Sequence, residues 1–404
     1  MNWIDGGTVT TPAGYLAAGV SAGIKPGTNR KDVALVVSTA PASAAAVFTT
    51  NRVQAAPIHV DREHLQDGCA RAVVLNSGNA NACTGEQGRR DAEAMCAIAG
   101  AALGLDAATV LVCSTGVIGV PMPMDRITAG VKAAATVLSA QGGADAARAI
   151  MTTDTVPKTC AVELDCQGSA VRLGGMAKGS GMIAPNMATM LAAITTDAAV
   201  EPELLQELLG RAVRRSFNCV TVDGDMSTND TVIFLANGAS GAPRLTSGDD
   251  PAVGRLYAGL EAVCCNLARQ IARDGEGATK LVSVDVQGAV DEMAARQVGL
   301  AVANSMLVKT AIFGNDPNWG RILCAMGYAG VAFDPGAATV TLCGVRIYGG
   351  GAGQPFDAQA LSAAMAGKEV SIGIDLGVAG GGGATIFTCD LSYEYVRINA
   401  EYTT

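Results

Sequence analysis

Short apolar runs alternate with longer segments of helical periodicity along the first half of the chain. Strands are expected at 33–39, 45–51, 71–76 and 110–115, and a pair joined by a glycine turn within 159–173. Helices are expected at 87–104, 124–139 and 143–151, where apolar residues recur at helical spacing. Pro202 stands where the first turn of a further helix would begin. The alternation of the two patterns predicts a layered α/β protein.

The second half continues this mixture. Segment 220–238 is predicted as strand, polar turn and strand, and one long helix is expected from about 251, capped by Gly275. A further helix is expected over 293–314, inside a smaller C-terminal lobe of short strands that spans about 280–404. The run Gly380–Gly383 is most simply a hairpin tip, because a phosphate loop would need a following helix and a Lys-Ser/Thr pair.

The composition of the chain excludes several classes of protein. The chain has 404 residues, a formal charge of −9 and a mean hydropathy of +0.30. The negative charge argues against nucleic-acid binding, since no cluster of Lys and Arg offsets it. No uninterrupted run of 18 apolar residues occurs, and the opening MNWIDGG lacks the basic region of a signal peptide. The twelve cysteines are scattered without a CxxC pair, so we expect reduced thiols, no metal and a cytoplasmic protein.

The stretch KGSGMIAPNMATML, from Lys178 to Leu191, carries the most information. It places Thr189 after a small residue, Ala188, at the start of an apolar run. A hydroxyl held against the preceding carbonyl can attack it and convert the amide to an ester, and water then releases the threonine as a new N-terminus. Its free α-amine, with an ordinary pKa of about 8, can act as its general base. The sequence therefore predicts self-cleavage between Ala188 and Thr189.

Histidine is a poor candidate for the base. The chain has two, His59 and His64, in one charged segment that we expect to be exposed. A Ser-His-Asp or Cys-His arrangement would need one of them at the nucleophile. An N-terminal threonine removes that need.

Two further segments combine hydroxyls with turns. Thr115 and Gly116 follow a predicted strand, where a hydroxyl and a backbone N–H can point at a developing oxyanion. An ordinary β-turn explains the same residues. Thr152 lies in MTTD at the end of a predicted helix, where it could bind a small polar ligand or form a local cap.

Lys178 and Glu276 each stand among glycines, in AKGSG and DGEGATK. An amino-acid substrate needs a cation for its carboxylate and a carboxylate for its ammonium, and this pair offers both. Solvated charges on loops would look the same in the sequence.

Three polar turns remain, NSGNANACTG, VDGDMSTND and GNDPNWGR. Asp223, Asp225 and Asp230 of the second turn lack the glycine and the glutamate of a calcium loop. We expect the three turns to shape a pocket wall, with Trp319 as a packing anchor.

The chain closely resembles the bifunctional ornithine acetyltransferase / glutamate N-acetyltransferase family of arginine biosynthesis in the ordered motifs KGSGMIAPNMATML, CSTGVIG, NSGNANACTG, MTTDTVPK, DGEGATK and FGNDPNWGR. The resemblance runs from VTTPAGYLAAGV near the start to the last residue. It implies a layered α/β sandwich similar to N-terminal-nucleophile enzymes. It also implies an α chain of residues 1–188 and a β chain of residues 189–404, which associate as an α2β2 heterotetramer.

The resemblance assigns roles to single residues. Thr189 matches the nucleophile, and Thr115 and Gly116 match the oxyanion-stabilising pair. The positions that match substrate-binding residues are Thr152, Lys178, Thr189, Glu276, Asn399 and Thr404. The use of Thr404 requires the C-terminal strand to fold back over the pocket.

The implied reaction moves the acetyl group of N2-acetyl-L-ornithine to L-glutamate through acetyl-Thr189, without a bound cofactor. Some family members also take acetyl from acetyl-CoA, which stays open here as a second donor. The nearest alternative is a self-cleaving amidohydrolase or aminopeptidase in which water resolves the acyl-enzyme. A non-catalytic amino-acid-binding protein would instead leave the Ala188–Thr189 bond intact.

Overall fold

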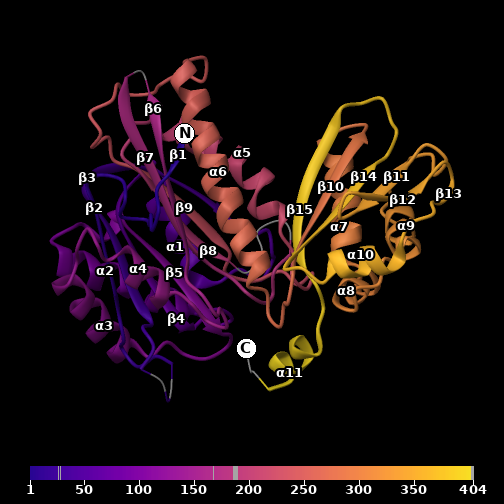
Figure 1. The fold of residues 1–404 in the computed structure, drawn as a ribbon. Helices are drawn as coiled ribbons and strands as arrows, with labels where there is room; N and C mark the ends of the chain where they lie inside the picture. The colour runs from indigo at the N-terminus through magenta and orange to yellow at the C-terminus, as the bar shows by residue number, and fades with distance from the viewer. Residues whose placement is uncertain (26, 28, 167, 185–189, 402–404) are drawn as a thin grey trace.

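The computed structural model describes all residues except 26, 28, 167, 185–189 and 402–404. The described residues form two lobes, each built on one β-sheet (Figure 1). Helix α6 (Pro251–Arg273) belongs to the larger lobe and packs against the strand β15 (Gly382–Cys389) of the smaller one. The predicted α/β class is confirmed.

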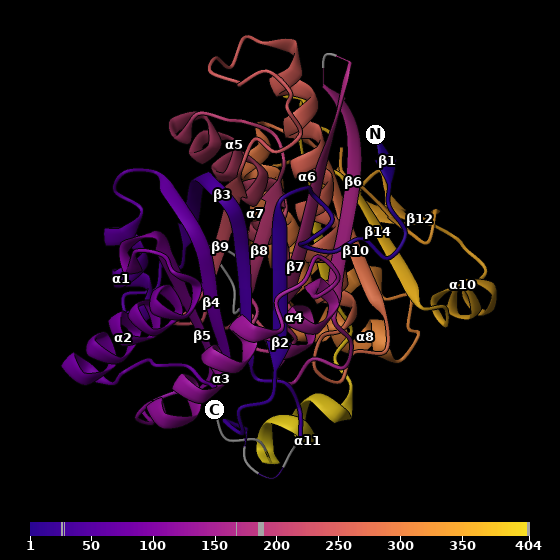
Figure 2. The same cartoon turned by 90° about the vertical axis from the view of Figure 1, so that its left-hand side faces the viewer.

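The larger lobe holds a sheet of nine described strands in the order β1-β6-β7-β8-β9-β3-β4-β5, with β2 paired to β3. The strands are β1 (Asn2–Trp3), β2 (Tyr15–Val20), β3 (Val33–Phe48), β4 (Cys69–Asn79), β5 (Val110–Val117), β6 (Lys158–Cys166), β7 (Ser169–Lys178), β8 (Leu191–Thr196) and β9 (Thr231–Ala236). The other helices of this lobe are α1 (Ala56–His64), α2 (Gly85–Leu103), α3 (Met124–Thr136), α4 (Gly143–Ala149) and α5 (Pro202–Arg215). Figure 2 shows the helices α1 to α4 gathered over the β2–β5 part of this sheet.

The strands β8 and β9 are buried along their whole length, which explains their uninterrupted apolar runs. Along β9, Phe234 joins a core with α5 and α6, whereas Ile233 faces a second core with α4. Lys178 at the end of β7 pairs with Leu191, which in turn pairs with Thr231. The register therefore brings the end of β7 and the starts of β8 and β9 to the same end of the sheet, where these neighbouring strands begin or finish.

The smaller lobe holds a sheet of six described strands in the order β13-β12-β11-β14-β10-β15. Its remaining strands are β10 (Leu281–Ala289), β11 (Thr339–Leu342), β12 (Val345–Gly349), β13 (Ala352–Gly353) and β14 (Glu369–Asp375). Its helices are α7 (Glu292–Asn304), α8 (Met306–Phe313), α9 (Trp319–Gly327) and α10 (Ala358–Met365), followed by the C-terminal helix α11 (Tyr393–Glu401). Among the described residues, no helix combines the length and apolarity needed to cross a membrane.

Two predictions of element boundaries are wrong. Two expected strands form one continuous strand, and one expected helix is broken into two. The strands expected at 33–39 and 45–51 form one strand, β3, because the exposed Pro41 falls in a register shift between Val37 and Ala42, where its missing N–H costs no ladder bond. The helix expected over 293–314 is two helices. Ser305 separates them in an extended conformation, and its hydroxyl accepts a hydrogen bond from the Val308 N–H at 3.3 Å as the N-cap of α8.

Three smaller expectations are wrong. Val220 makes only an isolated bridge to Phe387, so the first strand expected in 220–238 is absent among the described elements. Helix α6 ends at Arg273, and its C-cap is Asp274 instead of Gly275. Gly380–Gly383 is not a hairpin tip, because β10 lies between β14 and β15. A Cβ at Gly380 would collide with the Val290 backbone, so the glycines here serve a close crossing of two chain segments.

One of the two histidines is less exposed than expected. His64 is half-buried, and its Nδ1 lies 2.7 Å from the carbonyl oxygen of Val110. Asp61, on the same helix, accepts the Val112 N–H at 2.7 Å. Because β5 is the last strand of the sheet, α1 thereby supplies hydrogen-bond partners to an otherwise open edge.

Candidate active site

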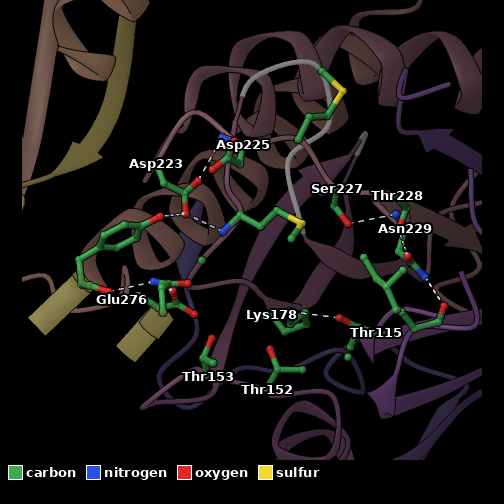
Figure 3. Close-up of a pocket in the computed structure, with 18 residues that line it drawn as sticks. Thr115, Thr152, Thr153, Lys178, Asp223, Asp225, Ser227, Thr228, Asn229 and Glu276 are labelled. Carbon is green, nitrogen blue, oxygen red and sulfur yellow. Dashed lines mark hydrogen bonds between the residues drawn. The ribbon is translucent and has the colours of Figure 1, made fainter. Parts of the chain in front are cut away.

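A pocket of about 280 Å³ lies at one end of the strands of the larger sheet, and residues of α11 also line it (Figure 3). Six of the residues singled out in the sequence line it: Thr115, Gly116, Thr152, Lys178, Glu276 and Asn399. They come from the ends of β5 and β7, the turns after α4 and α6, and α11. Ala188, Thr189 and Thr404 lie outside the described residues. The structure therefore gathers every described candidate at one pocket, and their roles stay predictions.

Gly116 lies near the end of β5, beside β4. It pairs with Gly78 and has φ of 136°, a conformation that side chains disfavour. A Cβ at this position would overlap the Gly78 carbonyl carbon, so only glycine fits. Asn229 joins β5 to the residue that follows β4, because its Nδ2 donates to the carbonyl oxygens of Ser114 at 2.9 Å and Ala80 at 2.6 Å. These contacts hold Thr115 and Gly116 at the pocket wall in a fixed geometry.

Lys178 is buried beneath the pocket. Its Nζ donates to the Thr115 Oγ1 at 3.3 Å, so that the threonine hydroxyl proton can be donated elsewhere. Burial lowers the pKa of Lys178, and the carboxylate of Asp154 opposes that shift most strongly. The pocket thus has a desolvated lysine in contact with the predicted oxyanion residue.

Carboxylates gather at another side of the pocket. Figure 3 shows Glu276, Asp223 and Asp225 together, with Lys178 between this group and Thr115. The Nδ2 of Asn399 donates to Glu276 Oε2 at 2.8 Å, and the hydroxyl of Tyr395 donates to Asp223 Oδ2 at 3.2 Å. Burial raises the pKa of Asp223. This side can receive a cationic group, whereas Lys178 can attract an anion.

The segment that closes the site at its C-terminal end is helical. The sequence led us to expect a strand folding back over the pocket, but α11 carries Tyr395 and Asn399 one turn apart on the face turned to the site. Gly277 permits this approach, because a Cβ there would overlap the Tyr395 backbone nitrogen. An i, i+4 pair of polar residues was the available sequence signal.

The chain on both sides of residues 185–189 is fixed by carboxylates. Asp223 accepts the N–H groups of Met182 at 2.7 Å and Ile183 at 2.8 Å, and Met182 has φ of 57°. On the C-terminal side of residues 185–189, the N–H of Met190 donates to Asp230 Oδ1 at 2.9 Å. Burial raises the pKa of Asp230 well above its ordinary value, despite this N–H. Sequence spacing gave no sign of these partners, which are about forty positions away.

The three polar turns divide between the lobes. Ala80 of the first turn lines the pocket, as do Asp223 and residues 225–229 of the second, as expected. The third turn does not, because Trp319 packs in the smaller lobe against Tyr348, with ring centroids 5.6 Å apart. Within the described residues, no group of three or more His, Cys, Asp or Glu side chains could hold a metal ion.

The chain is similar to known proteins over almost its whole length. The sequence model of the ArgJ family matches residues 16–404. The arginine biosynthesis bifunctional protein ArgJ of Symbiobacterium thermophilum is 54% identical over 406 residues, which cover 100% of both chains.

Two solved structures are also similar. The ArgJ crystal structure from Bacillus halodurans is 39% identical with a TM-score of 0.50, and the match covers 52% of this chain and 97% of that chain. An ornithine acetyltransferase from Mycobacterium tuberculosis, complexed with ornithine, is 46% identical with a TM-score of 0.43, over 45% of this chain and 97% of that chain.

Proposed function

Because this chain belongs to the ArgJ family, the bifunctional ornithine acetyltransferases of arginine biosynthesis, we propose that its pocket moves the acetyl group of N2-acetyl-L-ornithine to L-glutamate. The observation that carries this assignment is the convergence of Thr115, Gly116, Lys178 and Glu276 on one small cavity. A buried cation, a possible oxyanion pair and a carboxylate are the groups that an N-acetylated amino acid requires.

The reaction begins with self-cleavage. Thr189 Oγ attacks the Ala188 carbonyl carbon, the C–N bond breaks as the Thr189 nitrogen takes a proton, and water hydrolyses the resulting ester. In support of this step, the N–H of Met190, the residue that follows Thr189 in the sequence, is anchored on Asp230. The length of the solved Bacillus halodurans chain also supports cleavage, since it matches only about half of this chain while almost all of its own length is covered. The products are residues 1–188 and 189–404, which assemble as α2β2.

Acetyl transfer then proceeds in two displacements. Thr189 Oγ attacks the acetyl carbonyl of N2-acetylornithine while its own α-amine accepts the hydroxyl proton. The Thr115 hydroxyl and the Gly116 N–H donate to the oxyanion, and ornithine leaves as its amine regains the proton. The amine of glutamate attacks acetyl-Thr189 by the same route, releases N-acetylglutamate and restores the threonine.

Charge sorts the substrate within the pocket. Glu276, held by Asn399, faces the side-chain ammonium of ornithine, and Lys178 attracts a substrate carboxylate. Thr152 and Thr404 complete the binding groups. Acetyl-CoA serves as a second acetyl donor, in keeping with the bifunctional name of the relatives. We place this biosynthetic reaction in the cytoplasm.

The first experiment compares intact masses of the wild type and Thr189→Ala. Two wild-type fragments, the second starting at Thr189, and one uncut variant chain are the expected result. Acetyl transfer from N2-acetylornithine to glutamate is then measured on the cleaved protein. An uncut wild type would favour an amino-acid-binding protein, and release of free acetate without glutamate would favour an amidohydrolase.

A further inference from the structure

A buried cluster of charges lies directly behind the pocket. Lys158 is fully buried, and its Nζ is 2.7 Å from Asp154 Oδ1 and 2.6 Å from Asp274 Oδ2. The three residues lie within the motifs MTTDTVPK and DGEGATK, but the proposed reaction gives none of them a role. Buried ion networks are costly to form, because their charges lose their hydration.

The cluster joins three segments that carry proposed binding residues. Asp154 accepts the N–H of Thr152 at 2.9 Å and that of Gly179, next to Lys178, at 2.8 Å. The carbonyl oxygen of Asp274 accepts the Ser180 hydroxyl at 2.6 Å. The Glu276 N–H donates to the Ser180 carbonyl oxygen at 2.9 Å, which links the third segment.

The charges of the cluster do not balance by themselves. Two carboxylates and one lysine leave one net negative charge in a buried environment, where uncompensated charge is unfavourable. Lys178 is the neighbouring buried cation, and its charge lowers the pKa of Asp154 together with Lys158, against the effect of burial. With Lys178 protonated, two positive and two negative charges are present and the network is neutral.

We propose that Asp154, which Lys158 and the Gly179 N–H hold in place, keeps Lys178 protonated beside Thr115 and is therefore a positioning residue for acetyl transfer. The inference rests on the proposed function, in which Lys178 acts as a cation. A protonated Lys178 donates to the Thr115 Oγ1, which leaves the Thr115 hydroxyl proton for the oxyanion. The cluster thus links substrate binding to the stabilisation of the transition state.

The pH dependence of the enzyme tests this idea through two variants of opposite sign. Burial and the charge of Lys158 disfavour the protonated form of Lys178. The carboxylates that favour it are Asp154, Asp230 and Glu276. Lys25 is a further cation nearby. Activity that needs this cation is present below the pKa of Lys178 and is lost as the pH rises through it. Asp154→Asn removes an attractive charge, so the alkaline limb of kcat/KM should move to lower pH by about 1–3 units. Lys158→Met removes a repulsive charge and should move that limb to higher pH.

Asp274→Asn is the matched control. It also removes one carboxylate from Lys158, but Asp274 is not among the leading charges that shift the pKa of Lys178. We expect it to shift the alkaline limb less than Asp154→Asn does, even where both lower the melting temperature equally. A purely structural cluster would instead give equal losses of activity and no movement of the limb. Asp154→Glu, which keeps the charge, should retain the wild-type limb.

The assays use the cleaved enzyme, with cleavage verified by mass for each variant and rates expressed per cleaved chain. If Asp154→Asn does not fold, the upward shift in Lys158→Met still decides the matter. The proposal is overturned if the wild type has no alkaline limb, or if the folded variants leave it in place or move it in one direction. A wild type that transfers no acetyl at all contradicts the proposed function instead.

Discussion

The pocket is built from two regions that are held in different ways. Its inner wall, around Lys178 and Gly116, belongs to the sheet of the larger lobe and is buried and hydrogen-bonded from several directions. Helix α11 supplies Asn399 and Tyr395, yet none of its described residues is buried. Figure 1 shows α11 apart from both sheets.

The difference separates the two tasks of the site. Groups that meet developing charge gain from a rigid, water-poor setting, because they need no reorganisation during the reaction. Groups that only recognise the substrate can sit on an element that packs loosely and contacts the pocket through side chains. We therefore expect changes in the inner wall to lower kcat and changes in α11 to raise KM.

The largest effect is expected for Thr115→Ala. Loss of one oxyanion donor should lower kcat by about 10²–10³ with little change in KM. Steady-state kinetics on the cleaved variant measure this. Thr115→Ser, which keeps the hydroxyl, should recover most of the turnover. A cleaved Thr115→Ala enzyme with near wild-type turnover would remove Thr115 from the oxyanion site.

Removal of α11 should come next. A chain ending at Ser392 loses the Asn399 bond to Glu276 and the Tyr395 bond to Asp223, and with them the proposed binding residue Thr404. Hydrogen bonds to charged groups contribute about 1.5–3 kcal/mol, so the KM for N2-acetylornithine should rise by about 10–100-fold. The melting temperature should change little, because the helix buries no side chain. A large drop in melting temperature would contradict the contrast between the two regions.

Much of this arrangement follows from local sequence. Helices with strong periodicity, such as α2 and α5, lie close to where the sequence predicts them, because an apolar face specifies a helix locally. The breaks at Pro41 and Ser305 misled the prediction in opposite directions. In the first case the sheet continues around a proline, and in the second an N-cap interrupts an unbroken apolar pattern.

The site also has a part that the sequence predicts and a part that it does not. Thr115, Lys178 and Glu276 stand in motifs that draw attention by themselves, and the structure brings them to one pocket. The residues that hold these side chains in place do not stand out in the sequence. Lys158 meets Asp274 across 116 positions, and Tyr395 meets Asp223 across 172, so only the folded chain reveals these pairs. Long-range contacts of this kind carry no periodic signal in a single sequence.

A smaller effect is expected for Asn399→Ala, which removes one of the two α11 contacts. Glu276 Oε2 then loses its amide partner, and the KM for N2-acetylornithine should rise by about 10-fold with kcat nearly unchanged. Arg397→Gln is the control on the same helix, since Arg397 pairs only with Glu394 and Glu401 within α11 in the described ion pairs. Equal KM increases in the two variants would indicate a general disturbance of the helix.

The smallest effect is expected for Tyr395→Phe. The ring remains, but Asp223 Oδ2 loses the phenolic donor while keeping the Met182 N–H. This bond is 3.2 Å long and burial raises the pKa of Asp223, so we expect it to contribute less than the Asn399 bond, about 0.5–1.5 kcal/mol, which corresponds to a rise in KM of about 2–10-fold. Because Asp223 also fixes the chain before residues 185–189, the rate of self-cleavage should be measured in the same variant. An unchanged cleavage rate with a raised KM would assign Tyr395 to substrate recognition. Slower cleavage would show that α11 also supports the inner wall, and the two regions would then be less independent than their packing suggests.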